Sequence, residues 1–154
     1  MSDKISEHIS FKEGIKSHTA TRLGIDNSPS ELDLVRMQTV AEKVFEPLRK
    51  WVGGPIAINS FYRSPKLNSA IGGSKSSQHC IGCALDLDDN YGYKTNAEMF
   101  EYVKNNLDYD QMIWEFGTDE NPNWVHISYV SEDANRRRLL KASKINGKTT
   151  YSVI

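Results

Sequence analysis

The apolar positions of this 154-residue chain change period several times, which predicts alternating helices and strands. Ser28, Pro29 and Glu31 fit the N-cap, first and third positions of a capping box, and the glycine pair 53–54 stops the helical pattern that follows. We therefore expect one long helix, followed by a strand in the β-branched and aromatic run 55–62. The apolar face of the helix is expected to contain Leu32, Val35, Val40, Val44, Leu48 and Trp51.

A second helix and two hairpins are predicted further along the chain. Thr95 and Glu98 form another capping-box pattern, which opens a helix. The runs 110–116 and 123–130 are strand-like and are joined by a polar loop, while Asn146-Gly147 between two β-compatible runs is typical of a tight hairpin turn at a sheet edge. The buried stripe of the second helix is expected to be Phe100, Val103 and Leu107.

These elements predict an α+β domain in which helices pack on a mainly antiparallel sheet. With 38% hydrophobic residues, residues 1–154 can form a single domain with its own core. For the segment before about Ile25, the sequence predicts only a short helix or irregular structure.

Charge and hydropathy exclude several classes of partner. Nineteen basic and twenty acidic residues leave a net charge of -1, so we expect no nucleic-acid partner. The basic run 136–141 is interpreted as a solvated surface segment rather than a phosphate site. No stretch approaches the roughly 20 apolar residues of a membrane span, and the start lacks a secretory apolar region, so we expect synthesis in the cytoplasm without a signal peptide.

The segment SSQHCIGCALDLD, residues 76–88, concentrates the candidate chemistry. Turn-forming glycines and serines precede His79 and place it on a loop, whereas the alternation after Ala84 is that of a strand. Asp86 then faces away from the core beside the small Ala84. A partly buried carboxylate needs a cation, a donor or a metal ion as its partner.

The predicted hairpin adds a second histidine and a glutamate. If its loop closes symmetrically, Glu115 lies opposite Trp124 and Ile113 opposite His126, so Glu115 and His126 are diagonal neighbours on one face. Two histidines and one aspartate, with a fourth position for water, are typical of a catalytic zinc site. Glu115 can then act as a general base, and Arg63 can bind a carboxylate or an oxyanion.

Each of these residues also has a simpler interpretation. A histidine beside a strand aspartate is more often a hydrogen-bonded pair, Arg63 alone is more often a surface or capping residue, and Glu115 alone is more often solvated. Cys80 and Cys83 form a C-x-x-C pair, which can be a redox site or, with His79, part of a structural zinc site. No second cysteine pair exists, so we interpret both as small packing residues.

The segment from Ser77 to Asp86 resembles the S-x-H-x-x-G-x-A-x-D motif of the zinc D-Ala-D-Ala carboxypeptidase family, and WVHISY resembles its later histidine strand. Further segments between about residues 21 and 129 resemble the phage and prophage members. The resemblance implies a hedgehog/DD-peptidase type fold. It implies that Arg63 stabilises the substrate or the transition state and that Ser77 supports the first metal ligand or touches the substrate. It also implies one Zn²⁺ per chain, held by His79, Asp86 and His126.

One position departs from the family pattern. Many relatives carry an acidic general base three positions before the last histidine, where this chain has Asn123. Glu115 in WEFG resembles a glutamate of the phage-like branch and is our predicted base, with Asp119 or Glu120 on the loop as substitutes.

The expected function is that of a zinc metallopeptidase acting on peptidoglycan stem peptides, as a D-Ala-D-Ala carboxypeptidase or as an endolysin-type endopeptidase. We expect a monomer that acts at the bacterial cell wall, released by phage lysis machinery. Because of Asn123, a non-catalytic metal-containing domain that binds the cell wall or another protein is the alternative.

Overall fold

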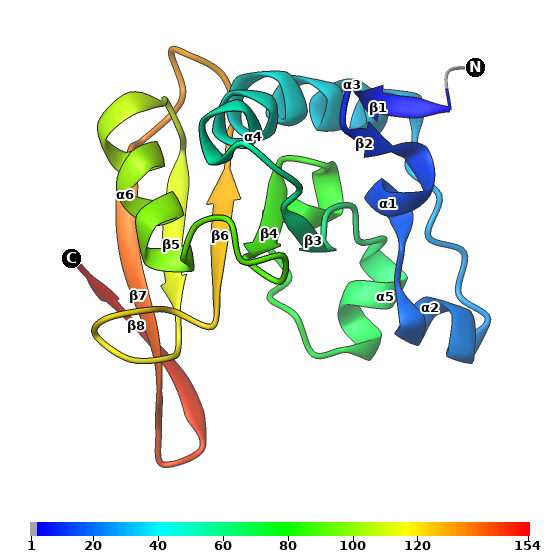
Figure 1. The fold of residues 1–154 in the computed structure, drawn as a ribbon. Helices are drawn as coiled ribbons and strands as arrows, with labels where there is room; N and C mark the ends of the chain where they lie inside the picture. Colours follow the sequence, from blue (N-terminus) through cyan, green and yellow to red (C-terminus); the bar gives the residue numbers. More distant parts are fainter. Residues whose placement is uncertain (1–2) are drawn as a thin grey trace.

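A computed structural model of the protein describes residues 3–154, and a six-stranded sheet forms its centre (Figure 1). Every neighbouring pair of strands is antiparallel except β5 with β7, which is parallel. This arrangement confirms the predicted α+β fold with a mainly antiparallel sheet. In spatial order the strands are β3 (Ala57–Ser60), β4 (Ala84–Asp88), β6 (Trp124–Ser128), β5 (Gln111–Glu115), β7 (Arg138–Ile145) and β8 (Lys148–Val153).

The other elements precede or connect these strands. A small two-stranded sheet, which the sequence did not predict, lies at the start of the chain and is followed by two short helices. The elements are β1 (Lys4–Ser6), β2 (Ile9–Ser10), α1 (Phe11–Ile15), α2 (His18–Leu23), α3 (Glu31–Val40), the π-helical turn η1 (Ala41–Phe45), α4 (Glu46–Val52), α5 (Pro65–Ala70), the 3-10 turn η2 (Gln78–Ile81) and α6 (Asn96–Asn106).

The predicted long helix is present as α3, η1 and α4, but it begins later than expected. Its N-cap is Ser30, whose side chain accepts a hydrogen bond from the Asp33 amide in a full capping box. The predicted N-cap, Ser28, instead donates its amide to Asp26 in the preceding turn. Both serines have an acidic residue three positions on, and the local turn selects the second.

The predicted apolar face of this helix was partly wrong. Val40, Val44 and Leu48 are fully buried, but Leu32, Val35 and Trp51 are 59%, 55% and 36% exposed. The wider π-helical turn lies where two pairs of consecutive residues, Val40–Ala41 and Val44–Phe45, are both buried in the core. The buried positions of the helix are Met37, Val40, Ala41, Val44, Phe45, Leu48 and Val52.

The second predicted helix is confirmed as α6. Thr95 and Glu98 form the expected capping box, and the stripe of Phe100 and Val103 is buried while Leu107 is partly buried. This helix and the α3–α4 helix pack on one face of the sheet (Figure 1). The sheet residues beneath them are Leu85, Leu87, Met112, Val125 and Ile127, all fully buried.

Both predicted hairpins are confirmed in register. In the β5–β6 hairpin Glu115 pairs with Trp124 and Ile113 with His126. In the β7–β8 hairpin Asn146 and Gly147 form the two-residue turn, with φ angles of 52° and 77°. As predicted, β8 is an edge strand of the sheet. Among residues 3–154, no helix has the length and apolar character needed to cross a membrane.

Candidate active site

The face of the sheet opposite the helices carries the candidate site. Because side chains alternate along a strand, residues paired across neighbouring strands form rows on this face. One row runs from Asp86 on β4 to His126 on β6, Ile113 on β5 and Leu140 on β7. The next row contains Trp124, Glu115, Ala142 and Tyr151.

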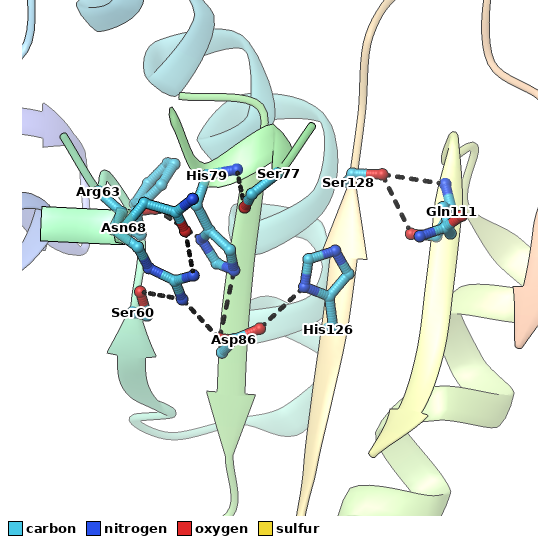
Figure 2. A network of polar contacts seen from close by, with 10 residues as sticks. Ser60, Arg63, Asn68, Ser77, His79, Asp86, Gln111, His126 and Ser128 are labelled. Atoms are coloured by element: carbon cyan, nitrogen blue, oxygen red, sulfur yellow. Dashed lines mark hydrogen bonds and ion pairs between the residues drawn. The ribbon is translucent and has the colours of Figure 1, made fainter. Parts of the chain in front are cut away.

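His79, Asp86 and His126 converge at one end of the first row (Figure 2). The Nε2 of His79 lies 3.3 Å from Oδ2 of Asp86, and Nδ1 of His126 lies 3.0 Å from Oδ1. Their side chains are only 3%, 13% and 12% exposed, respectively. The structure therefore brings together the three residues that the sequence assigned to a metal site.

A hydrogen bond fixes how His79 presents its ring. Its Nδ1 lies 2.8 Å from the carbonyl oxygen of Phe61, and because a carbonyl only accepts, Nδ1 carries the proton. In the neutral ring the lone pair of Nε2 then points at the Asp86 carboxylate. Two electron-rich atoms at this distance require a positive charge between them, either a proton or a metal ion.

The charge of Asp86 is stabilised by its two histidine partners. Burial alone would raise the pKa of this carboxyl, but the positive charges of His79 and His126 and the hydrogen bonds from both outweigh burial and hold its pKa well below the usual range. This environment favours the carboxylate form of Asp86, which is the form that binds a metal ion.

The backbone around His79 depends on two small residues. Ser77 caps the 3-10 turn η2, because its hydroxyl accepts a hydrogen bond from the His79 amide at 3.3 Å. Gly82 ends the turn with a φ of 78°, and a Cβ at this position would lie 2.5 Å from the carbonyl oxygen of Asp33. The sequence placed His79 on a loop, and within that loop His79 lies on the single 3-10 turn η2.

Glu115 lies in the neighbouring row and is only 7% exposed. Burial raises its pKa to about 7; the positive charge of His126 opposes this rise and the negative charge of Asp86 adds to it. A carboxyl group with a pKa near neutrality is suited to exchange protons during a reaction. The simpler interpretation of Glu115 as a solvated strand residue is therefore wrong.

Arg63 approaches Asp86 from the segment after β3, and two residues hold its guanidinium (Figure 2). Nη1 donates to Oδ1 of Asn68 at 3.1 Å, and Nη2 donates to the Ser60 hydroxyl at 3.4 Å and lies 3.9 Å from Oδ2 of Asp86. Gly73 leaves room for this arrangement, since a Cβ there would lie 2.0 Å from Oδ1 of Asn68.

The substitutes for Glu115 lie away from these side chains. Asp119 is 87% exposed and pairs with Lys141, and Glu120 is exposed on the same loop. Asn123 is exposed too, and its amide donates to the carbonyl oxygen of Glu115 at 2.9 Å. Among the three general-base candidates named from the sequence, only Glu115 lines the cleft.

The two cysteines are free thiols outside the His-Asp-His group. Cys83 is 4% exposed, and burial raises the pKa of both thiols, which lowers their thiolate content. This environment is typical of packing residues rather than of a redox pair.

One open cleft of about 770 Å³ is bordered by Arg63, Ser77, His79, Asp86, Glu115 and His126. The sequence did not identify several of its residues, because they come from segments whose sheet partners cannot be read locally. The C-terminal hairpin, for example, was predicted from its turn and its two β-compatible runs, which do not show which strand it pairs with. The lining residues missed by the sequence analysis include Gln78, Gln111, Trp124, Arg136, Arg138, Thr149 and Tyr151.

A six-stranded sheet that presents His126, Asp86 and the buried Glu115 to an open cleft, with His79 added from the turn η2, defines a metal-dependent hydrolase type of site. The chain belongs to the Peptidase M15 family, whose sequence model matches residues 7–128. The family consists of zinc metallopeptidases, and the His-Asp-His group is one that can hold such an ion. A search among curated proteins found no match to the chain. The family match ends with β6, so β7 and β8 lie beyond it.

Proposed function

We propose that this protein is a zinc-dependent peptidase that hydrolyses peptide bonds in peptidoglycan stem peptides. His79, Asp86 and His126 would hold the ion, Glu115 would be the general base, and Arg63 would bind the reacting carbonyl. The observation that carries the proposal is the burial of Glu115, with a pKa raised to about 7, in the row beside the His-Asp-His group.

The donor set fits zinc. Two imidazole nitrogens and one carboxylate oxygen, with one position left for water or substrate, are a common catalytic set. Tetrahedral bonds of about 2.0–2.1 Å place neighbouring ligand atoms roughly 3.4 Å apart. The separations of 3.3 Å and 3.0 Å between the histidine nitrogens and the oxygens of Asp86 are close to this value.

Glu115 and Arg63 would then have separate roles in catalysis. When bound, zinc supplies a Lewis acid that polarises the substrate carbonyl and makes water more acidic. Glu115 takes the proton of the attacking water and returns it to the leaving amine, for which a pKa near neutrality is favourable. Arg63 is held by Asn68 and Ser60 with its guanidinium toward the cleft, where it stabilises the negative charge that develops on the carbonyl oxygen.

Peptidoglycan is the proposed substrate because of the family and because the motifs of this chain resemble those of its phage and prophage members. The enzyme would act at the bacterial cell wall, in a phage or prophage lysis setting. Removal of the terminal D-Ala and internal cleavage are both compatible with an open cleft, and they differ in their products.

Mass spectrometry of the products tests the proposal. Zinc-loaded protein would be incubated with a synthetic pentapeptide stem ending in D-Ala-D-Ala and with purified cell-wall sacculi. Release of a single D-Ala identifies a carboxypeptidase, whereas internal fragments identify an endopeptidase. No product from either substrate would contradict the proposal and favour the non-catalytic alternative.

A pair of variants tests the role of Glu115. Glu115→Gln should lower the rate by about 100- to 10,000-fold while zinc content is unchanged, because general-base catalysis typically contributes this factor. Glu120→Gln, which removes the same charge from the exposed loop, is the matched control and should cleave as the wild type does. Equal rates for Glu115→Gln and wild type would assign the base elsewhere.

A further inference from the structure

We propose that Arg138, on the C-terminal hairpin, binds a carboxylate group of the peptide that occupies the cleft; this inference rests on the proposed function. Arg138 lies on β7, beyond residues 7–128 that match the family model.

The register of the sheet places Arg138 on the cleft face. It pairs with Gln111, which is two residues before Ile113 on β5, and it lies two residues before Leu140 on β7. All four residues line the cleft. Arg138 and Gln111 therefore form a third row, on the opposite side of the Ile113–Leu140 row from Glu115.

The charge of Arg138 is not offset by an acidic side chain. Its neighbours in the basic run are all paired: Arg136 makes two hydrogen bonds from its guanidinium to Asp110, Arg137 pairs with Asp108, and Lys141 pairs with Asp119. Arg138 forms no ion pair or side-chain hydrogen bond with any other residue between 3 and 154. Arg136, Arg137 and Arg138 are exposed, as expected of a solvated surface run, and Arg138 in addition lines the cleft.

The other two arginines of the cleft are already engaged. Arg63 lies 3.9 Å from Asp86 and is held by Asn68, and the guanidinium of Arg136 is bound to Asp110, whose side chain is only 3% exposed. Because Arg63 is assigned to the reacting carbonyl and Arg136 is paired with Asp110, a carboxylate elsewhere on a bound peptide would find its uncommitted cation at Arg138.

The distance from the His-Asp-His group suits a short peptide segment. Arg138 is two strands and two residues away from His126 in the sheet, which corresponds to roughly 12 Å between Cα atoms for strands about 4.8 Å apart with a rise of about 3.3 Å per residue. The long side chain shortens this gap. An extended peptide advances about 3.5 Å per residue, so the bound carboxylate would lie within a few residues of the scissile bond.

A carboxylate is the ligand that a free guanidinium recognises best in a peptide, because both of its oxygens can accept hydrogen bonds from one arginine. Stem peptides offer two sources: the C-terminal carboxylate, and a carboxylate on an internal residue such as a γ-linked D-glutamate. Both share the chemistry, and an amide at one position or the other distinguishes them.

The test is a calorimetric titration with zinc-loaded Glu115→Gln protein, in which the peptide should remain intact. Three stem peptides would be used: one with both carboxylates free, one with a C-terminal amide and one with an internal amide. The free peptide should bind about 10- to 100-fold more tightly than the amide that lacks the recognised group, as expected for a charged hydrogen bond. Adding Arg138→Gln should abolish this preference by weakening only the peptides that retain that carboxylate, and Arg138→Lys should restore part of it.

Lys148→Gln is the matched control, because it removes one positive charge from the same hairpin at an exposed position that does not line the cleft. It should leave all three affinities unchanged. Equal weakening of all three peptides by Arg138→Gln, an unchanged preference for the free peptide, or no binding of any peptide would overturn the inference. Hydrolysis by the wild type is measured separately: an Arg138-dependent preference without hydrolysis would contradict the proposed function alone, and hydrolysis without that preference would contradict the role of Arg138 alone.

Discussion

Alternate residues of the same strands build two faces with opposite properties. On β4, Leu85 and Leu87 are fully buried beneath the helices, while Asp86 between them faces the cleft. On β6, Val125 and Ile127 are fully buried and His126 faces the cleft. Each proposed ligand on the sheet is therefore one residue away from the core on both sides, so packing on one face fixes side-chain positions on the other.

The largest expected effect on stability comes from the packed face. Leu87→Ala should lower the free energy of unfolding by about 2–5 kcal/mol, because it removes a fully buried side chain and leaves a cavity under the helices. Chemical denaturation would measure the loss. Val153→Ala on the edge strand, where the side chain is 72% exposed, is the control and should change stability by less than about 0.5 kcal/mol. If Leu87→Ala lowered the free energy of unfolding by less than about 1 kcal/mol, packing on the helix-covered face would not be the main source of stability.

A smaller and opposite effect is expected on the cleft face. Burial raises the pKa of Glu115 from 4.5 to about 7, so its contribution to stability is full below pH 4.5 and is lost as the pH rises through about 7. Glu115→Gln should therefore stabilise the metal-free protein at pH 8, by up to about 3 kcal/mol, and have little effect at pH 4.

Thermal or chemical unfolding at the two pH values would check this prediction, with Glu120→Gln on the exposed loop as the control. The same difference between Glu115→Gln and wild type at both pH values would contradict a raised pKa. Burial of the ionised Glu115 carboxylate would then have no measurable effect on the free energy of unfolding.

The smallest effect is expected from a residue that positions another. Asn68 is 4% exposed and accepts a hydrogen bond from Arg63, while its amide donates to the carbonyl oxygen of Ser74 at 2.8 Å. Asn68→Ala should lower kcat/KM for stem-peptide cleavage by about tenfold, the worth of one charged hydrogen bond, with zinc content unchanged. Unchanged kinetics would mean that Asn68 does not orient Arg63.

Much of the cleft face could be predicted from the sequence because it depends on period-two alternation and on one symmetric loop. These two features predicted that Asp86 faces away from Leu85 and that Glu115 and His126 are diagonal neighbours, and the register confirms both. The buried surfaces of the helices were harder to predict from the sequence. Leu32 and Val35 are apolar yet exposed, so spacing alone did not identify the buried side of the long helix.

The rest of the cleft depends on contacts between distant segments. The parallel pairing of β7 with β5 bridges a long connection, and no local pattern reveals which strand the C-terminal hairpin joins. Arg138 therefore appeared in the sequence only as one member of a basic run. Asn68 was missed for the same reason, since its partner Arg63 is fixed by the fold around Gly73 and not by spacing.

Metal content is the most direct test of the central claim, that the cleft face holds a zinc ion through His79, Asp86 and His126. Elemental analysis of the purified protein should find about one zinc per chain, lost in His79→Ala and in His126→Ala and retained when Cys80 and Cys83 are replaced together by serine. Zinc retained in both histidine variants but lost with the cysteines would place the metal at Cys80 and Cys83 and contradict the proposed peptidase site.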